Sequence, residues 1–239
     1  MQKANLDSIF ASFHNGVAHR GLHDEVRPEN SKAAFAHAME LGLPFETDVH
    51  LTVDHRLVIN HDHELGRVTG KDGVIEKLTL QEIKDNYRLK DGSQLMEMGE
   101  LLSFWGEKVP MALEIKEYFG NGEDIKAALK PLLDPIKDLS KLVLISFSAN
   151  ALRIWKEEKW NRGLLIGGGE IDHPSLPNDF EFLDVDFTLL SDPRLLAYKN
   201  PGQKVLSWTI HDENSLSIAR AHSDAMTFEI LPPERLQGN

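Results

Sequence analysis

Three carboxylates have spacings that could place them around a single cation. Glu46 and Asp48 are two residues apart in an apolar run, and Glu114 lies in another such run, two residues before Lys116. Residues i and i+2 of a strand point to the same face and lie roughly 6–7 Å apart, so Glu46 and Asp48 can converge on one ion. Paired carboxylates away from water are unfavourable without a proton or a cation between them. Carboxylate oxygens suit Mg²⁺ or Ca²⁺, so we expect these three acids to bind such an ion.

Two histidines and two cations could serve a phosphate group beside that ion. His19, Arg20 and Gly21 follow a short apolar run, and His61 follows another. Two imidazoles flanking a reaction centre allow one to accept a proton while the other donates one. The Arg20 guanidinium presents a planar fork to phosphate oxygens, and Lys116 supplies a second cation. Gly21 permits the unusual dihedrals or close backbone approach that a ligand loop needs.

The same residues also have plain structural explanations. Glu46 and Asp48 could lie on the solvated face of an antiparallel sheet, and Glu114 and Lys116 could form an ion pair that ends a strand. A lone histidine such as His19 is more often a packed or surface residue. We favour the chemical interpretation because three strand ends carry such groups together.

Two further side chains have alternative roles that the sequence leaves open. Asp62 could orient the neighbouring His61 or cap the following turn, and capping is slightly favoured. Trp208 alternates with Leu206 and Ile210, so core packing is its expected role, with the wall of a substrate pocket as the alternative.

Strand-like and helix-like stretches alternate along nearly the whole chain. Apolar runs typical of strands occur at residues 17–19, 45–51, 57–60, 111–115, 142–147, 164–166, 183–185, 205–210 and 225–228. Helices are expected at residues 31–41, 98–104, 123–133, 149–158, 193–199 and 213–221. Asn30 and Asp212 are predicted N-caps, and Gly42 a helix stop. This alternation favours a parallel α/β sheet.

The nine strand-like runs exceed the strands of a (β/α)8 TIM barrel by one. Residues 57–60 follow residues 45–51 too closely for a parallel crossover, which needs a dozen or more residues. They are therefore predicted to form the antiparallel arm of a β-hairpin after the second strand. A two-residue loop at residues 54–55 would place Asp48 opposite His61.

Length and composition limit the classes of protein that this chain can be. We expect one domain over residues 1–239, with residues 66–92 as a small insertion. A net charge of −12 argues against a nucleic-acid partner. Without cysteine, disulfides and thiolate chemistry are excluded, which fits the cytoplasm. No apolar run reaches the ~20 residues of a membrane span, so no stable membrane association is expected. No sequence feature indicates an oligomeric state.

Several of these segments together resemble the glycerophosphodiester phosphodiesterase family. The shared elements occur in the family's order and approximate spacing between residues 16 and 116, and more loosely at residues 208–210. They are His19-Arg20-Gly21, Pro28-Glu29-Asn30-Ser31 with Ala34, Phe35 and Ala38, Glu46-Thr47-Asp48-Val49, His61-Asp62 with Leu65, Arg67, Thr69 and Gly70, and Leu113-Glu114-Ile115-Lys116. Near the last strand, a Thr-Asp-x-Pro ending usual in the family is replaced by Phe228-Glu229-Ile230-Leu231-Pro232.

The resemblance implies a (β/α)8 barrel of the phospholipase C-like phosphodiesterase type that hydrolyses a glycerophosphodiester to glycerol 3-phosphate and an alcohol. The expected partner is therefore a small phosphodiester substrate, with Mg²⁺ or Ca²⁺ as cofactor. The resemblance assigns the metal to Glu46, Asp48 and Glu114, acid–base catalysis to His19 and His61, and phosphate binding to Arg20 and Lys116.

Two other functions compete with this hypothesis. The pair His61-x-His63 could belong to a metal-dependent amidohydrolase on a similar barrel, although the first strand offers only His19 where such sites usually carry His-x-His. A non-catalytic phosphoester-binding barrel is the second alternative, although a binding protein would not need both imidazoles.

Overall fold

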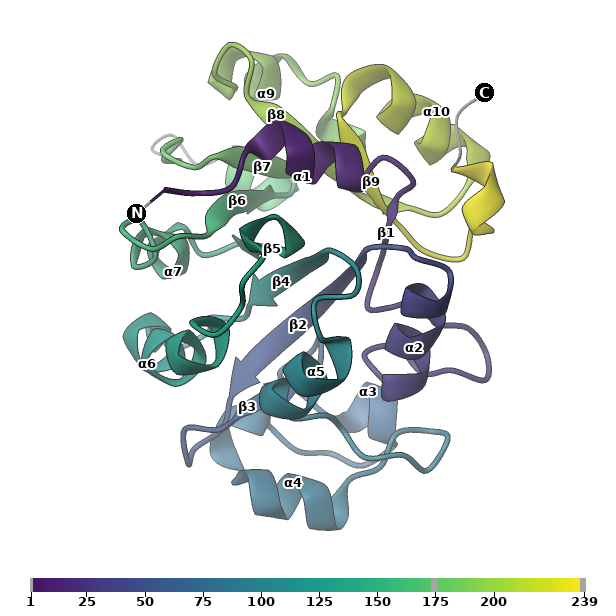
Figure 1. Cartoon of the computed structure of the whole chain (residues 1–239), viewed down its shortest axis with the longest axis vertical. Coiled ribbons are helices and arrows are strands. Elements are labelled where there is room, and N and C mark those ends of the chain that lie inside the picture. Colours follow the sequence, from purple (N-terminus) through teal and green to yellow (C-terminus); the bar gives the residue numbers. More distant parts are fainter. Residues whose placement is uncertain (1, 173–175, 237–239) are drawn as a thin grey trace.

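The computed structural model describes residues 2–172 and 176–236, and within them strands and helices alternate along the chain (Figure 1). The strands are β1 (Val17–Ala18), β2 (Phe45–Leu51), β3 (Leu57–Ile59), β4 (Met111–Ile115), β5 (Leu142–Ser146), β6 (Asn161–Ile166), β7 (Phe182–Asp186), β8 (Lys204–Ile210) and β9 (Ala225–Phe228). The α-helices are α1 (Leu6–Ser12), α2 (Lys32–Glu40), α3 (Gly66–Thr69), α4 (Leu80–Asn86), α5 (Met98–Trp105), α6 (Gly122–Leu133), α7 (Ala149–Arg153), α8 (Gly168–Ile171), α9 (Pro193–Tyr198) and α10 (Glu213–His222).

Eight of the strands close into a parallel barrel, which confirms the expected fold. The sheet runs β1-β9-β8-β7-β6-β5-β4-β2-β3, and an additional parallel pairing of β1 with β2 closes it. The remaining strand, β3, pairs antiparallel with β2. Because β1 pairs with β2 only at Ala18 and Phe45, the later half of β2 is free to hold β3.

The hairpin of β2 and β3 exists, but its predicted register is wrong by one residue. Val49 pairs with Ile59, and the Asn60 amide donates to the carbonyl of Asp48, so Asn60 rather than His61 lies opposite Asp48. The loop has three residues instead of two, because His55 adopts a left-handed φ of 57°. This conformation is typical of three-residue hairpin loops.

The alternation of side chains along β2 separates the barrel interior from the helical layer as expected. Phe45 and Val49 are fully buried among the apolar side chains between the strands and the surrounding helices. Glu46 and Asp48 point the other way, into the barrel. The core therefore orients both acids toward the interior.

The floor of the barrel is closed by α1, a helix that we did not predict. Ile9, Phe10 and Phe13 pack with inward-facing residues of the strands, such as Ala112 and Phe182. The Phe10 and Phe182 rings meet edge to face with centroids 5.5 Å apart. This apolar plug leaves the opposite, carboxyl-terminal end of the barrel as the polar end.

One of the two predicted N-caps is also wrong. Ser31, not Asn30, caps α2 by accepting a hydrogen bond from the amide of Ala34. Asn30 instead turns its buried side chain toward β2, with a backbone φ of 55°. The Asp212 cap of α10 is confirmed, and Gly42 follows the last residues of α2 with a left-handed φ of 68°.

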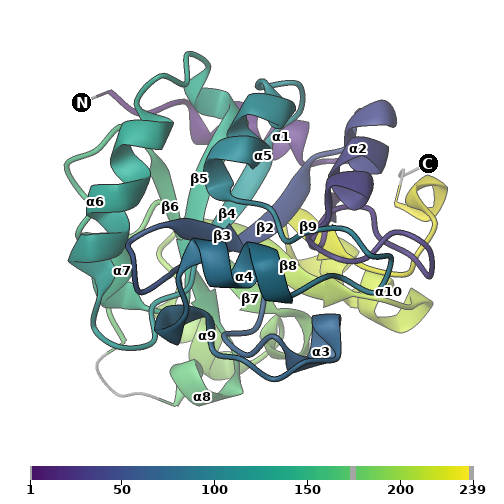
Figure 2. The ribbon, with the colours of Figure 1, turned by 90° about the horizontal axis from the view of Figure 1, so that it is seen from below.

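The segment after the hairpin carries α3, α4 and a short 3-10 helix at Ile75–Lys77. Leu80 and Ile83 of α4 pack against Val58 of β3 in a small apolar cluster of their own. Figure 2 shows α4 next to β3.

Candidate active site

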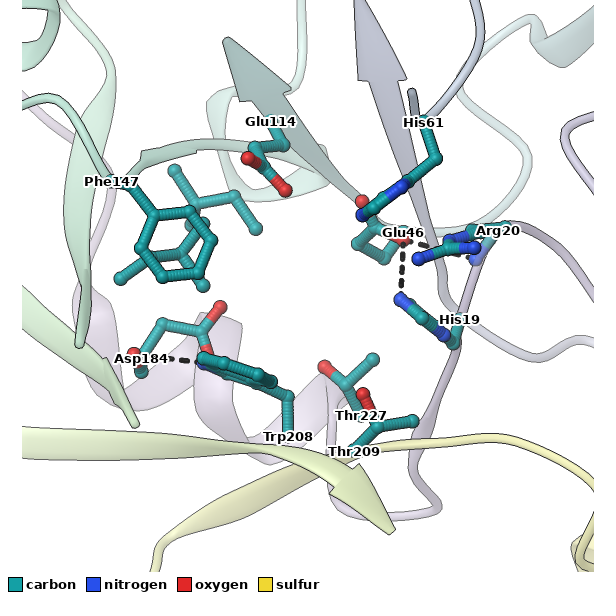
Figure 3. A pocket seen from close by; sticks show the side chains of 12 residues that line it. His19, Arg20, Glu46, His61, Glu114, Phe147, Asp184, Trp208, Thr209 and Thr227 are labelled. Carbon is teal, nitrogen blue, oxygen red and sulfur yellow. Dashed lines mark hydrogen bonds and ion pairs between the residues drawn. The ribbon is translucent and has the colours of Figure 1, made fainter. Parts of the chain in front are cut away.

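A cavity of about 280 Å³ opens at the carboxyl-terminal end of the barrel strands, where barrel enzymes carry their active sites. Residues from each of the strands β1 to β9, or from the loop that follows it, surround the cavity, and Figure 3 shows how their side chains lie. They are His19, Arg20, Glu46, His61, Glu114, Ile145, Phe147, Leu165, Asp184, Trp208, Thr209 and Thr227.

The three predicted metal ligands come together beside this cavity. Each of Glu46, Asp48 and Glu114 offers a carboxylate oxygen within 4.8 Å of those of the other two. The parallel register explains this, because Asp48 of β2 lies directly beside Glu114 of β4. All three residues are buried, so the alternative of a solvated sheet face is wrong.

Burial and the charges of neighbouring groups shift the pKa values of these three acids strongly. Burial raises the pKa of Glu46 well above its usual range, and the charges of Asp48 and Glu114 raise it further. Burial likewise raises the pKa of Glu114 to about 7, although Lys116 opposes the shift. Burial would also raise the pKa of Asp48, but Lys116, His61 and Arg20 outweigh it and hold that pKa below its usual range.

Of the two predicted phosphate-binding residues, Arg20 lines the cavity and Lys116 does not. Lys116 is buried between two acids, with its Nζ 3.0 Å from Asp48 Oδ1 and 2.7 Å from Glu114 Oε1. The Arg20 guanidinium is held 2.8 Å from Glu29, and its backbone amide donates to Glu46 Oε2 at 3.0 Å.

A carboxylate that follows the last strand holds His19. Glu229, which follows β9, places its Oε2 2.6 Å from His19 Nδ1, and His19 Nε2 lies 3.9 Å from Glu46. The hydrogen bond from His19 lowers the pKa of Glu229 to about 2. The turn after β1 depends on Gly21, whose φ is 79° and whose missing Cβ would lie 2.9 Å from Cβ of Ala34.

The second histidine is held by its neighbour in the chain. His61 Nδ1 lies 2.7 Å from Asp62 Oδ1, and Arg67 Nε donates to the other oxygen of Asp62 at 2.5 Å. Asp62 therefore orients His61, so the capping role that we slightly favoured is wrong. Burial lowers the pKa of His61, with Asp48 opposing the shift.

Asn30 and Glu29 support the site in ways that sequence reasoning missed. Asn30 donates to Asp48 Oδ2 at 2.8 Å and accepts from the Thr47 hydroxyl at 2.8 Å, which fixes one oxygen of the acid. Glu29 joins Arg20 to Arg67. Both residues belong to the Pro28-Glu29-Asn30-Ser31 element of the family resemblance, and that element was the signal that could have identified them.

The remaining histidines near the mouth stay outside the acidic cluster. His50 places its Nδ1 2.8 Å from Glu76 and its Nε2 3.1 Å from the carbonyl of His61. His63 lies 4.0 Å from Glu76, and both imidazoles stack on Tyr118. The 3-10 helix at Ile75–Lys77, which carries Glu76, thereby supports the loop that carries His61.

The far side of the cavity is formed by Phe147 and Trp208, whose rings meet edge to face with centroids 5.6 Å apart. Trp208 also packs against the apolar cluster of the barrel interior, so its expected core-packing role is confirmed in part, while its position on the cavity matches the alternative. A register shift between Ser207 and Ile210 separates Ile210 from the face that Trp208 occupies. The buried Asp184 of β7 also faces this side, a residue to which the sequence analysis gave no role.

The donor set of the acidic cluster fits a divalent cation. Its oxygens are carboxylate oxygens, which Mg²⁺ and Ca²⁺ prefer. Oε1 of Glu46 is buried without a hydrogen-bond partner among the described residues, and an unsatisfied buried carboxylate oxygen is unfavourable unless a cation meets it. Glu46, Asp48 and Glu114 could therefore hold such an ion.

Comparisons with known proteins identify the family of this chain. A sequence model of the glycerophosphoryl diester phosphodiesterase family matches residues 19–227. The glycerophosphodiester phosphodiesterase of Caldanaerobacter subterraneus subsp. tengcongensis is 31% identical over 214 residues, which cover 81% of this chain and 84% of that protein.

Solved structures show the same barrel. A glycerophosphodiester phosphodiesterase from Parabacteroides distasonis has a TM-score of 0.76 and 26% identity, covering 92% of this chain and 94% of that one. A phosphodiesterase from Oleispira antarctica, solved with its product sn-glycerol-3-phosphate, has a TM-score of 0.79 and 27% identity, with the same coverage of 92% and 94%. The chain therefore belongs to the glycerophosphoryl diester phosphodiesterase family.

Proposed function

We propose that this protein hydrolyses glycerophosphodiesters to sn-glycerol 3-phosphate and an alcohol with the help of a divalent cation. The observation that carries the proposal is the convergence of Glu46, Asp48 and Glu114 within 4.8 Å of one another, next to a cavity lined by His19 and His61. Membership of the family supports the same reaction.

In this proposal the acids hold Mg²⁺ or Ca²⁺, which supplies a positive charge for a nonbridging phosphate oxygen. Arg20 lines the cavity and donates to phosphate oxygens. Lys116 is proposed to do the same by exchanging one of its two acidic partners for phosphate.

The two histidines exchange protons with the substrate. One of His19 and His61 removes a proton from the attacking hydroxyl, and the other protonates the oxygen of the leaving alcohol. The attacking group is water, or the neighbouring glycerol hydroxyl followed by water, and the final products are the same. Glu229 and Asp62 form hydrogen bonds with the Nδ1 atoms of His19 and His61. The Nε2 atoms therefore remain available for proton transfer to and from the substrate.

Each of the two competing functions would require features or results that differ from those of a phosphodiesterase. An amidohydrolase would need imidazoles among its metal ligands, but His63 lies beside Glu76 and not with the acids, and the family assignment disagrees. A phosphoester-binding protein would bind a glycerophosphodiester tightly and release no product.

The proposal is tested by measuring glycerol 3-phosphate release from several diesters, with and without a chelator. We expect release to require Mg²⁺ or Ca²⁺. Glu46→Gln and Asp48→Asn should each lower kcat by about 100-fold or more while the protein stays folded, because transition-state charge then lacks its counterion. The control is Glu40→Gln, at the exposed end of α2, which should leave release unchanged. Undiminished turnover in the Glu46 variant would contradict the metal assignment.

We also infer a location and a partner for this protein. In residues 2–172 and 176–236, no helix has the length and apolar character needed to span a membrane. We infer the cytoplasm from the absence of cysteine, and a small phosphodiester as partner from the size of the cavity.

A further inference from the structure

The cavity has two chemically different sides (Figure 3). His19, Arg20, His61 and Glu46 lie together on one side, and Phe147, Trp208 and Asp184 face them from across the cavity. If the phosphate binds at the acidic cluster, as in the proposed function on which this inference rests, another part of the diester must extend toward the aromatic side.

Asp184 is the unusual residue on that side. It lies in the middle of β7 and is only 1% exposed, yet it lines the cavity. Its Oδ1 is buried with no hydrogen-bond partner among the described residues. Buried polar atoms in proteins are nearly always satisfied, and one that is not requires an explanation.

No cation of the described chain neutralises Asp184. Burial raises the pKa of Asp184 well above its usual range, and the nearby charge of Glu114 raises it further. Asp48, equally buried, differs because Lys116 lies 3.0 Å away. A carboxyl group in such surroundings is completed by a ligand that brings both a hydrogen-bond donor and a positive charge.

The neighbouring aromatic rings favour the same kind of ligand. The Phe147 and Trp208 rings meet at an interplanar angle of 82° and line the same side of the cavity as Asp184 (Figure 3). Indole and benzene faces attract ammonium groups through their quadrupoles. Trp208 is held in place by donating its Nε1–H to the carbonyl of Asp184 at 3.1 Å.

We propose that Asp184, Trp208 and Phe147 form the subsite for the alcohol portion of the diester and select an alcohol that carries a primary ammonium group. A primary ammonium has three N–H donors to offer the carboxylate, whereas a quaternary ammonium has none. A cavity of about 280 Å³ is at the small end of ligand sites, which suits a two-carbon amino alcohol. Glycerophosphoethanolamine has this chemistry.

The test compares kcat/KM for three diesters of glycerol 3-phosphate, with ethanolamine, choline and glycerol as the alcohols. The unsubstituted protein should prefer the ethanolamine diester over the other two by about 10-fold. Asp184→Asn preserves the shape of the side chain but removes its charge. It should lower kcat/KM for the ethanolamine diester by about 30-fold or more and for the glycerol diester by less than about threefold.

Asp186→Asn is the matched control, because it removes the same charge two residues further along β7, from an acid that does not line the cavity. It should leave the preference intact, since asparagine can still cap Thr188, as Asp186 does. Equal losses for all three diesters in Asp184→Asn would show that Asp184 contacts the shared glycerol portion, and would overturn the inference.

The ranking of the three diesters gives a second measurement that does not depend on the folding of any variant. A glycerol or choline diester cleaved as well as the ethanolamine diester would also overturn the proposed selectivity, while the proposed function would stand. Release of glycerol 3-phosphate from none of the three would refute the proposed function itself, and the subsite with it.

Discussion

Burial, together with opposite charges at short range, determines the pKa of each acid in the cluster. Lys116 sits between Asp48 and Glu114, so Asp48 stays ionised while burial raises the pKa of Glu114 to about 7. Glu46, which has only the more distant Arg20 side chain and a backbone amide to offset burial, also holds its proton more tightly than usual. The cluster therefore binds protons near neutral pH that a cation must displace.

Cation binding should consequently strengthen as the pH rises. Below pH 7 Glu114 is mostly protonated, and a protonated carboxyl group is a poor ligand, so metal binding there must release protons. We expect the Kd for Mg²⁺ or Ca²⁺ to fall between pH 6 and pH 8, with more protons released per ion at pH 6. Titration calorimetry in two buffers of different ionisation enthalpy measures both quantities. A Kd independent of pH, with no proton release, would contradict the raised pKa values.

Glu229 should act as a positioning residue for His19. Because its pKa is about 2, its carboxylate is ionised throughout the useful pH range and accepts from Nδ1. Glu229→Ala should lower kcat by about 10-fold with little change in KM, since the imidazole loses its orientation. Glu229→Gln should restore part of the rate, because the amide oxygen can still accept this hydrogen bond.

The control for this series is Glu234→Ala, an exposed acid five residues further on, which should leave kcat unchanged. A loss of rate that Gln does not relieve, accompanied by a lower melting temperature, would indicate that Glu229 only stabilises the fold.

Individual strands were the most predictable elements, because their two faces have different surroundings. In β2 the apolar residues Phe45 and Val49 alternate with Glu46 and Asp48, and this pattern indicated both the strand and the orientation of the acids. The hairpin register was not predictable in the same way. It depends on the left-handed conformation of His55, and the sequence there lacks the glycine that usually marks such a position.

The helix α1 is an element that the local sequence did not predict. Its seven residues are too few to form a stable helix in isolation, so its structure depends on contact with the barrel floor. Phe10 is 4% exposed and meets Phe182 of β7.

Phe10→Ala should lower the free energy of unfolding by about 3–5 kcal/mol, because it removes a large buried side chain and leaves a cavity. Ser8→Ala, at an exposed position of the same helix, should change stability by less than about 0.5 kcal/mol. Denaturant unfolding followed by tryptophan fluorescence measures both. Equal stability of the Phe10 variant and the unsubstituted protein would contradict the role of α1 as the barrel floor.

The two ends of the barrel have different roles: one end stabilises the fold, and the other carries the candidate active site. Apolar side chains of α1 and of the strands fill one end, and ionisable groups surround the cavity at the other. Barrel closure joins the two ends of the chain, because β1 pairs with β9. That pairing brings His19 to Glu229, 210 residues away.

From its residues alone, this sequence determined the barrel, the hairpin and the set of acids, histidines and cations at the strand ends. These features depend on the local alternation of side chains and on the order of strands, and both can be identified directly in the sequence. Only the tertiary structure decided which partners each group has: Glu229 for His19, Asn30 for Asp48, and none among the described residues for Oδ1 of Asp184. Those contacts depend on register and on barrel closure, since a shift of one residue reverses the direction of every side chain.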